Sequence, residues 1–262
     1  MRLTPKAFSD LKPKKLPKGS FMDLRDPCIC VTPDGRLMIN AGLAYNGRQD
    51  HQTLAWFSKD GKTWGPATLI GDHQYWIWRV TWHKEIAYGV GRIYHKRVPR
   101  LYRGNDGTHF KVLVNNDDFF PHNPGPSEAT LRFLADDTAF CLIRLNPVPG
   151  YKTDHAHLGT ARPPYTHWEW KDLGARVGGP NLILLPDGRF VGSARLYDSR
   201  RRTALCWIDP KAGTLTEALT LPSGGDSSYC GLVLHDGLLW VSYYSSHEGK
   251  ASIYLAKVKI HD

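Results

Sequence analysis

The chain has 262 residues, and its 34 Lys and Arg against 25 Asp and Glu give a formal net charge of +9. A hydrophobic fraction of 41% excludes an intrinsically disordered chain, which has few core-forming residues. No apolar run approaches the roughly 18 residues of a membrane-spanning helix, so no membrane is expected as a partner. The 25 Gly and 18 Pro follow no period, which excludes collagen and, with the many aromatic residues, indicates short strands joined by turns.

The positive charge favours acidic ligands but does not predict nucleic acid. Lysines cluster only at Lys12, Lys14, Lys15 and Lys18, in a Pro-interrupted lead-in typical of a solvated segment. Elsewhere the excess is largely arginine, which suits forked recognition of carboxylates. Residues 1–20 carry no apolar segment of a secretory signal, so we expect a cytoplasmic protein, or a secreted or periplasmic one if a signal has been removed.

Tight-turn signals recur along the chain at an almost constant spacing. They centre on Asp34, Lys84, Asp136, Asp187 and Asp236, at intervals of 50, 52, 51 and 49 residues. Asp-Gly between strand-like runs is the strongest short signal for a β-hairpin. Each turn separates two strand-like runs, which are 28–32 and 37–41, 77–82 and 86–90, 129–134 and 139–143, 181–185 and 190–194, and 231–234 and 238–243.

Further strand-like runs, such as 53–57 and 253–258, follow the hairpins. Four strands in about 50 residues are the unit of a β-propeller. The sequence therefore predicts an all-β, five-bladed β-propeller as one domain over residues 1–262, with 1–20 as a lead-in. The last blade lacks an outer strand, which Ala7–Leu11 could supply.

The repeat places residues that are far apart in sequence around one rim. The inner strands begin at Arg25-Asp26-Pro27, Trp78-Arg79, Ser127-Glu128, Gly179-Pro180-Asn181 and Ser228-Tyr229. Arg144, Arg195 and Tyr244 each follow a turn aspartate by eight residues, and the loop after the second strand adds Arg48, Asp50 and His51. Charged residues at strand ends are costly to bury without partners, so this set is a candidate binding site, with salt bridges across the channel as the alternative.

A second turn series carries a family resemblance. Residues 58–64 and 104–110 both place Asp-Gly three residues before an aromatic residue, 46 residues apart. With the Arg-x-Pro at 25–27, Ser127-Glu128 and the Tyr229 hairpin, the chain resembles the Asp-box (BNR-repeat) sialidase or neuraminidase superfamily. This resemblance makes a six-bladed sialidase-type propeller the alternative fold.

The resemblance also implies roles. Arg25, Arg144 and Arg195 would clamp a substrate carboxylate, and Tyr229 would be the nucleophile with Glu128 as its proton partner. Asp50 would be the acid/base, with Arg48 beside it. Arg79, His51 and Tyr244 complete the expected substrate-binding set.

Other interpretations stay open. Five blades and Arg25-Asp26-Pro27 are also similar to furanosidase-type glycosidases, which would make Asp26 a base or nucleophile and Glu128 the general acid. We expect a glycoside hydrolase acting on an anionic glycan. The alternatives are a uronate lyase with Tyr229 or His51 as base, and a non-catalytic glycan-binding propeller. No cofactor and no metal are expected, and the oligomeric state is not predicted.

Overall fold

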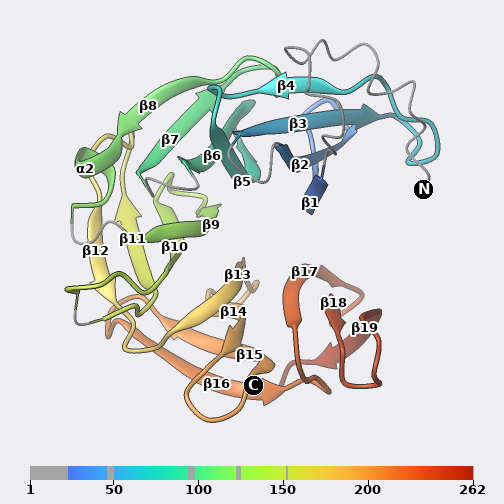
Figure 1. The fold of residues 1–262 in the computed structure, drawn as a ribbon, viewed down its shortest axis with the longest axis vertical. Helices are drawn as coiled ribbons and strands as arrows, with labels where there is room; N and C mark the ends of the chain where they lie inside the picture. Colours follow the sequence, from blue (N-terminus) through green and yellow to red (C-terminus); the bar gives the residue numbers. More distant parts are fainter. Residues whose placement is uncertain (1–22, 46–49, 94–97, 122–124, 152, 262) are drawn as a thin grey trace. The chain divides into compact units, whose positions relative to one another are not determined.

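A computed structural model of the protein describes residues 23–45, 50–93, 98–121, 125–151 and 153–261. In these residues the chain forms five antiparallel sheets, each made of consecutive strands (Figure 1). The only described helix is the single turn α2 (Asn116–Phe119), and no helix in this part of the chain is long and apolar enough to span a membrane. The fold is a five-bladed β-propeller, as the repeat predicts, and not the six-bladed alternative.

The first two blades have four strands each. Blade one contains β1 (Asp23–Val31), β2 (Leu37–Tyr45), β3 (Asp50–Ser58) and β4 (Thr68–Ile70). Blade two contains β5 (Tyr75–His83), β6 (Ile86–Ile93), β7 (Pro99–Gly104) and β8 (Lys111–Asn115).

The remaining blades follow the same order. Blade three contains β9 (Pro126–Phe133), β10 (Ala139–Leu145), β11 (His157–Ala161) and β12 (Glu169–Asp172). Blade four contains β13 (Val177–Leu184), β14 (Phe190–Leu196), β15 (Arg202–Asp209) and β16 (Thr214–Thr220). Blade five has three strands among the described residues, β17 (Ser227–His235), β18 (Leu238–Ser245) and β19 (Ser252–Lys259). Residues 7–11 lie outside the described residues, so their pairing with this blade stays a prediction.

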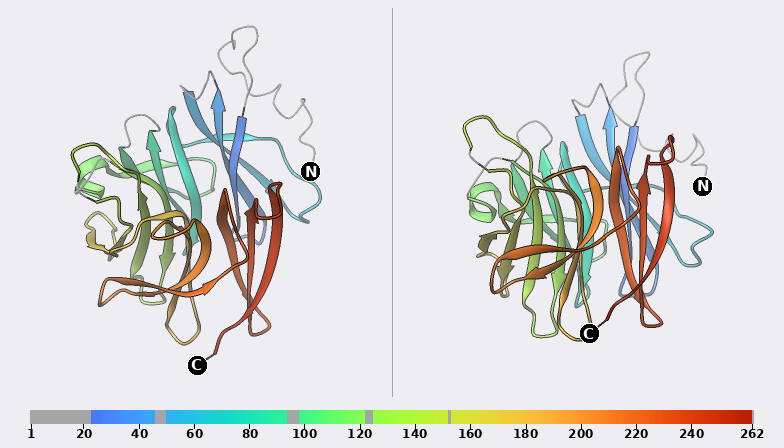
Figure 2. Two further views of the ribbon diagram at one scale, coloured as in Figure 1. Left: turned by 60° about the horizontal axis from the view of Figure 1, so that its bottom comes forward. Right: turned by 90° about the horizontal axis from the view of Figure 1, so that it is seen from below.

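Contacts divide the chain into two compact units, which are described separately. Blades one and two form the unit that ends at Phe119, and blades three to five form the unit that begins at Phe120. Figure 2 shows the hairpins of the second unit running side by side. The expectation that residues 1–262 make a single domain stays a prediction.

All five predicted hairpins are present, and their turns are stabilised locally. In the two Pro-Asp-Gly-Arg turns, Asp34 and Asp187 each accept a hydrogen bond from the Nε of Arg36 and Arg189, at 2.7 Å in both cases. The intervening glycine has φ of +79° in one turn and +86° in the other, a conformation that glycine adopts without strain. The same interactions recur because the same four residues recur.

Within each unit the sheets pack face to face through apolar side chains. Between blades one and two the buried cluster includes Met38, Tyr75 and Ile77. Between blades three and four it includes Leu142 and Leu182, and a further cluster joins blades four and five. This packing fixes the inner strands, and therefore the ends that carry the predicted site residues.

Candidate functional site

Every inner strand is irregular at the place where the sequence analysis puts the rim. The pairing with the second strand shifts in all five blades, between Arg25 and Cys28, between Ile77 and Val80, opposite Ile143–Leu145, between Gly178 and Asn181, and between Ser228 and Gly231. Such β-bulges re-aim side chains and are frequent beside active sites. Asp26, Ser228 and Tyr229 have φ of 52°, 96° and 57°, a left-handed backbone that is uncommon outside glycine.

Glu128 collects contacts from three blades of the second unit. Its side chain is only 5% exposed. Arg144 Nη1 donates to Oε1 at 2.5 Å, Tyr229 Oη donates to the same oxygen at 2.8 Å, and the Gly179 N–H donates to Oε2 at 2.5 Å. The two predicted partners Tyr229 and Glu128 are therefore in direct contact. All three neighbours donate hydrogen bonds to the Glu128 carboxylate, whose ionised oxygens can only accept.

The Tyr229 ring is held in place on both sides. A Cβ added to Gly179 would lie 3.0 Å from Cγ and Cδ2 of the ring, so the ring rests directly on this glycine. Gly179 has φ of +58°, which also favours glycine there. Tyr244 lies beside the ring with centroids 5.8 Å apart, and Arg144 Nη1 lies 3.5 Å from Oη.

Arg195 is buried and holds the bulge of β17. Its Nε and Nη2 donate to the Ser227 carbonyl at 2.7 and 2.5 Å, and Nη2 also donates to Tyr244 Oη at 3.0 Å. Its guanidinium lies 5.5 Å from the centroid of the Tyr229 ring. Nη2 is also 2.7 Å from Oδ1 of Asp226, whose side chain is 70% exposed. Most of its hydrogen-bond donors are therefore engaged within the protein, as in the salt-bridge alternative.

The environment keeps both arginines charged. Burial alone would lower the pKa of Arg144, but the Glu128 carboxylate and then Tyr229 more than compensate and raise it. Burial likewise opposes the charge of Arg195, and the neighbouring tyrosines raise its pKa above the ordinary value. Burial, followed by the hydrogen bond with Asp226, raises the pKa of Tyr244, which is neutral at pH 7.

The sequence analysis does not identify a second layer around these residues. Tyr197 Oη accepts a hydrogen bond from Arg195 Nη1 at 3.3 Å, and its ring carries the guanidinium of Arg176 at 4.5 Å. Arg176 Nε in turn lies 2.9 Å from Oδ2 of Asp154. The one sequence signal for this layer is the position of Tyr197, two residues after Arg195, a spacing that puts both side chains on the same face of an extended chain. No feature of the sequence indicates that the Gly179 N–H binds Glu128.

The remaining predicted residues belong to the first unit. Arg25 pairs with Asp23 at 2.5 Å, a carboxylate that the sequence analysis does not single out. His51 is 2% exposed and stacks on Trp76 with ring centroids 5.9 Å apart. It is therefore buried where blade one packs against blade two. Arg79 is half-buried in the bulge of β5.

Two further predicted residues are not placed. Arg48 lies outside the described residues, as does the side chain of Asp50, whose backbone opens β3. The structure thus brings together Glu128, Arg144, Arg195, Tyr229 and Tyr244. That Arg25, Asp26, Arg48, Asp50, His51 and Arg79 join them stays a prediction.

Comparison with known proteins adds evidence for the fold. No family model matches the chain, and no curated protein matches it. Among solved structures, a Dyadobacter fermentans protein of unknown function has a TM-score of 0.74 at 14% identity, over 91% of this chain and 77% of that one. A thermostable family-43 glycoside hydrolase has a TM-score of 0.65 at 11% identity, over 92% and 91%.

A Hadza microbial sialidase has a TM-score of 0.68 at 17% identity, over 97% of this chain but 55% of its own, so this chain spans about half the length of that enzyme. At such identities the likeness shows a shared fold. The chain is therefore a propeller of the kind on which several glycoside hydrolases are built.

Proposed function

We propose that this protein is a glycoside hydrolase that acts on an anionic glycan, with Tyr229 as the nucleophile and Glu128 as its proton acceptor. The observation that carries the proposal is the 2.8 Å hydrogen bond from Tyr229 Oη to Glu128 Oε1, on a ring flanked by two arginines. A nucleophile in hydrogen-bond contact with an oriented base is the general signature of covalent catalysis.

The contacts of Tyr229 and Glu128 suit a first step in which the sugar is transferred to the tyrosine. Tyr229 Oη bonds to the anomeric carbon while the bond from that carbon to the leaving oxygen breaks. The phenolic proton passes to Glu128, and the leaving oxygen takes a proton from a general acid. Asp50 is the residue we propose for that acid. Water then cleaves the glycosyl–tyrosine bond, as in retaining glycosidases.

A phenol is a reasonable nucleophile when the substrate is anionic, because a neutral attacking group is not repelled by the substrate carboxylate. Arg144 directs Nη1 to Glu128 and Tyr229, and among the described residues no hydrogen bond occupies its Nε or Nη2. These donors are available for a carboxylate, which arginine binds in a forked geometry. The glycosidases among the fold neighbours support a carbohydrate substrate.

The test is release of the aryl group from aryl glycosides of sialic acid, of uronic acids and of neutral furanoses. We expect turnover of a carboxylated substrate, and a fall in kcat of about 10²–10⁴ in both Tyr229→Phe and Glu128→Gln. Tyr254→Phe, which removes a hydroxyl that donates to Glu248 in the same blade, is the control and should keep full activity.

Quenching the reaction should trap a glycosyl adduct on the peptide that contains Tyr229. Full activity in Tyr229→Phe would refute the nucleophile. An unsaturated, ultraviolet-absorbing product would instead support a lyase, and binding without turnover would support a glycan-binding propeller.

A further inference from the structure

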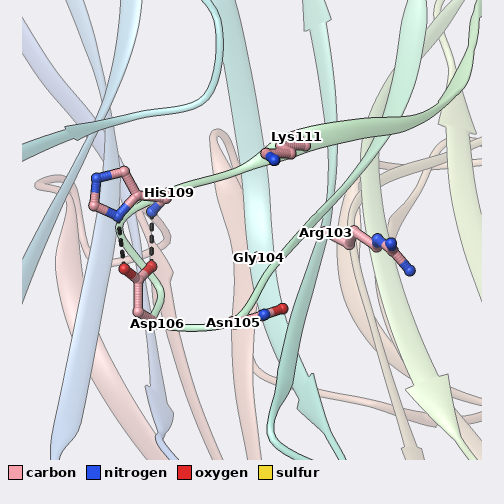
Figure 3. A pocket seen from close by; sticks show the side chains of 6 residues that line it. All are labelled: Arg103, Gly104, Asn105, Asp106, His109 and Lys111. Atoms are coloured by element: carbon pink, nitrogen blue, oxygen red, sulfur yellow. Dashed lines mark hydrogen bonds and ion pairs between the residues drawn. The ribbon is translucent and has the colours of Figure 1, made fainter.

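A pocket on blade two lies apart from the inner strands. It has a volume of about 300 Å³ and is formed by the hairpin that joins β7 to β8, the outermost strand of this sheet. Arg103, Gly104, Asn105, Asp106, His109 and Lys111 line it (Figure 3). These lining residues belong to the first unit, so the pocket is independent of the Glu128–Tyr229 site, which lies in the second unit.

Two cations lie opposite one another in the strand register of this hairpin, and Figure 3 shows their side chains diverging. Arg103 and Lys111 are direct partners in the β7–β8 register, and both are exposed. Like charges directly opposite one another destabilise a sheet. Among the residues that the structure describes, neither side chain forms an ion pair, so their positive charges are not neutralised.

The one carboxylate in the pocket is already engaged. Asp106 Oδ1 accepts hydrogen bonds from the backbone N–H groups of Thr108 and His109, both at 2.8 Å, and Oδ2 lies 2.6 Å from His109 Nδ1. Figure 3 shows Asp106 and His109 facing one another at the turn, on the opposite side of Gly104 from Arg103. Burial opposes ionisation of Asp106, but these hydrogen bonds outweigh it and lower the pKa of the carboxyl, so Asp106 stays ionised and caps the turn.

The turn does not need the two cations. The equivalent turn of blade one uses Asp60 in the same way, accepting from Lys62 N and Thr63 N at 2.8 and 2.7 Å. There Phe57 and Gly65 stand across from one another where blade two has its two cations, joined by a 2.9 Å backbone hydrogen bond. The charge pair is thus an addition to a turn that forms without it.

The hairpin is also tightly packed at two of its glycines. A Cβ on Gly104 would lie 2.3 Å from the His109 carbonyl oxygen, so the two strands are in close contact at this point. Gly107 is packed under the rings of Phe57 and Trp82, which would lie 3.1 and 2.9 Å from an added Cβ. The turn that carries the pocket residues is therefore packed against two aromatic side chains that border the apolar core of the unit.

The geometry points to a second ligand site here, which binds an anionic sugar unit through its sulfate or carboxylate group. Arg103 and Lys111 are exposed register partners, so both long side chains can turn toward one anionic group, and the exposed Asn105 amide can bond a hydroxyl of the same sugar. A single-stranded nucleic acid is the less suitable ligand, because no Phe, Tyr or Trp lines the pocket to stack a base and the cations form one pair and not a stripe.

The experiment uses the full chain with a sulfated disaccharide and a uronate disaccharide as probes, followed by calorimetry and by the backbone resonances of residues 103–111. We expect binding that weakens about tenfold or more in the double variant Arg103→Gln/Lys111→Gln, since two charge-assisted hydrogen bonds are lost. The matched control is Lys59→Gln/Lys62→Gln, which removes the same charge from the exposed turn of blade one and should bind as the parent does.

The two probes distinguish the anionic groups, because a sulfate site prefers the first and a carboxylate site the second. Equal weakening in both double variants would overturn the proposal in favour of a long-range charge effect. Failure of the parent to bind either probe, or tighter binding of an oligonucleotide through the same residues, would also overturn it. None of these outcomes bears on turnover at Tyr229, which is measured separately.

Discussion

Tyr229 and Glu128 are 101 positions apart in the chain, yet Tyr229 Oη lies 2.8 Å from Glu128 Oε1. The contact joins blade five to blade three inside one compact unit. Arg144 completes it by pairing with the same carboxylate oxygen at 2.5 Å. Glu128 is thus both the acceptor of a tyrosine proton in the proposed reaction and the counter-ion of a largely buried arginine, and these two roles can be separated experimentally.

Glu128→Gln should destabilise the fold as well as impair the proposed reaction. The amide keeps the shape of the side chain but leaves Arg144 without its counter-ion, and removing one partner of a buried ion pair costs about 3 kcal/mol or more. The free energy of unfolding in urea measures this. Glu169→Gln changes an exposed carboxylate of blade three and should stay within about 0.5 kcal/mol of the parent. Equal stability of the two variants would contradict the buried pair.

Gly179→Ala should displace the Tyr229 ring. The substitution meets two obstacles, a φ of +58° and a Cβ only 3.0 Å from the ring atoms. Gly188→Ala is the matched control, since its φ of +86° imposes similar backbone strain but nothing lies within 4 Å of the new Cβ. Both variants should lose about 1–2 kcal/mol of stability. Only Gly179→Ala should also lose kcat with little change in KM; a similar loss in Gly188→Ala would mean that strain alone is responsible.

The sequence predicts the hairpins well because their cause is local. Asp-Gly and Pro-Asp-Gly-Arg favour a turn wherever they stand between apolar runs, so the positions of β1–β2 and β13–β14 follow from a few adjacent residues. The approach of Tyr229 to Glu128 is different. The sequence predicts this approach only from the equal spacing of the blades together with a family resemblance. The structure has the contact, inside the second unit.

The rest of the site could not be predicted, because it depends on backbone groups. The Gly179 N–H binds Glu128, and the Ser227 carbonyl accepts two hydrogen bonds from Arg195. Every residue has a backbone carbonyl and every residue except proline has an N–H, so the sequence does not distinguish those that are used. The sequence analysis therefore treats Arg195 as available for substrate, whereas the structure shows most of its donors engaged.

Tyr102 should make the fold sensitive to alkaline pH. It is fully buried, and its Oη donates to Asp72 at 2.9 Å. Burial, together with the hydrogen bond to Asp72, raises the pKa of this phenol above its ordinary value of 10.0. In the unfolded chain the phenol ionises near pH 10, while the native phenol keeps its proton. The stabilising contribution is complete below about pH 10 and decreases as pH rises further.

Urea unfolding of the parent and of Tyr102→Phe between pH 7 and pH 11 measures this contribution. The difference in unfolding free energy should be constant up to about pH 10, and should then change in favour of the variant by at most about 1.4 kcal/mol per pH unit. Parallel stability curves over the whole range would show that the native phenol titrates like an unfolded one.

Asp226→Asn should strengthen the binding of a carboxylated ligand to the Glu128–Tyr229 site. Asp226 places a carboxylate oxygen 2.7 Å from Arg195 Nη2, so a ligand carboxylate that approaches this arginine must compete with it. Because Asp226 is 70% exposed, the pair is weak, worth at most about 1 kcal/mol, and removing it should tighten binding about two- to fivefold. Asp236→Asn removes the same charge from the exposed β17–β18 turn and should leave the affinity unchanged. A neutral ligand of the same size should bind both variants like the parent. Weaker binding of the carboxylated ligand to Asp226→Asn would show instead that Asp226 orients Arg195 for the ligand, and the idea of competition would then be wrong.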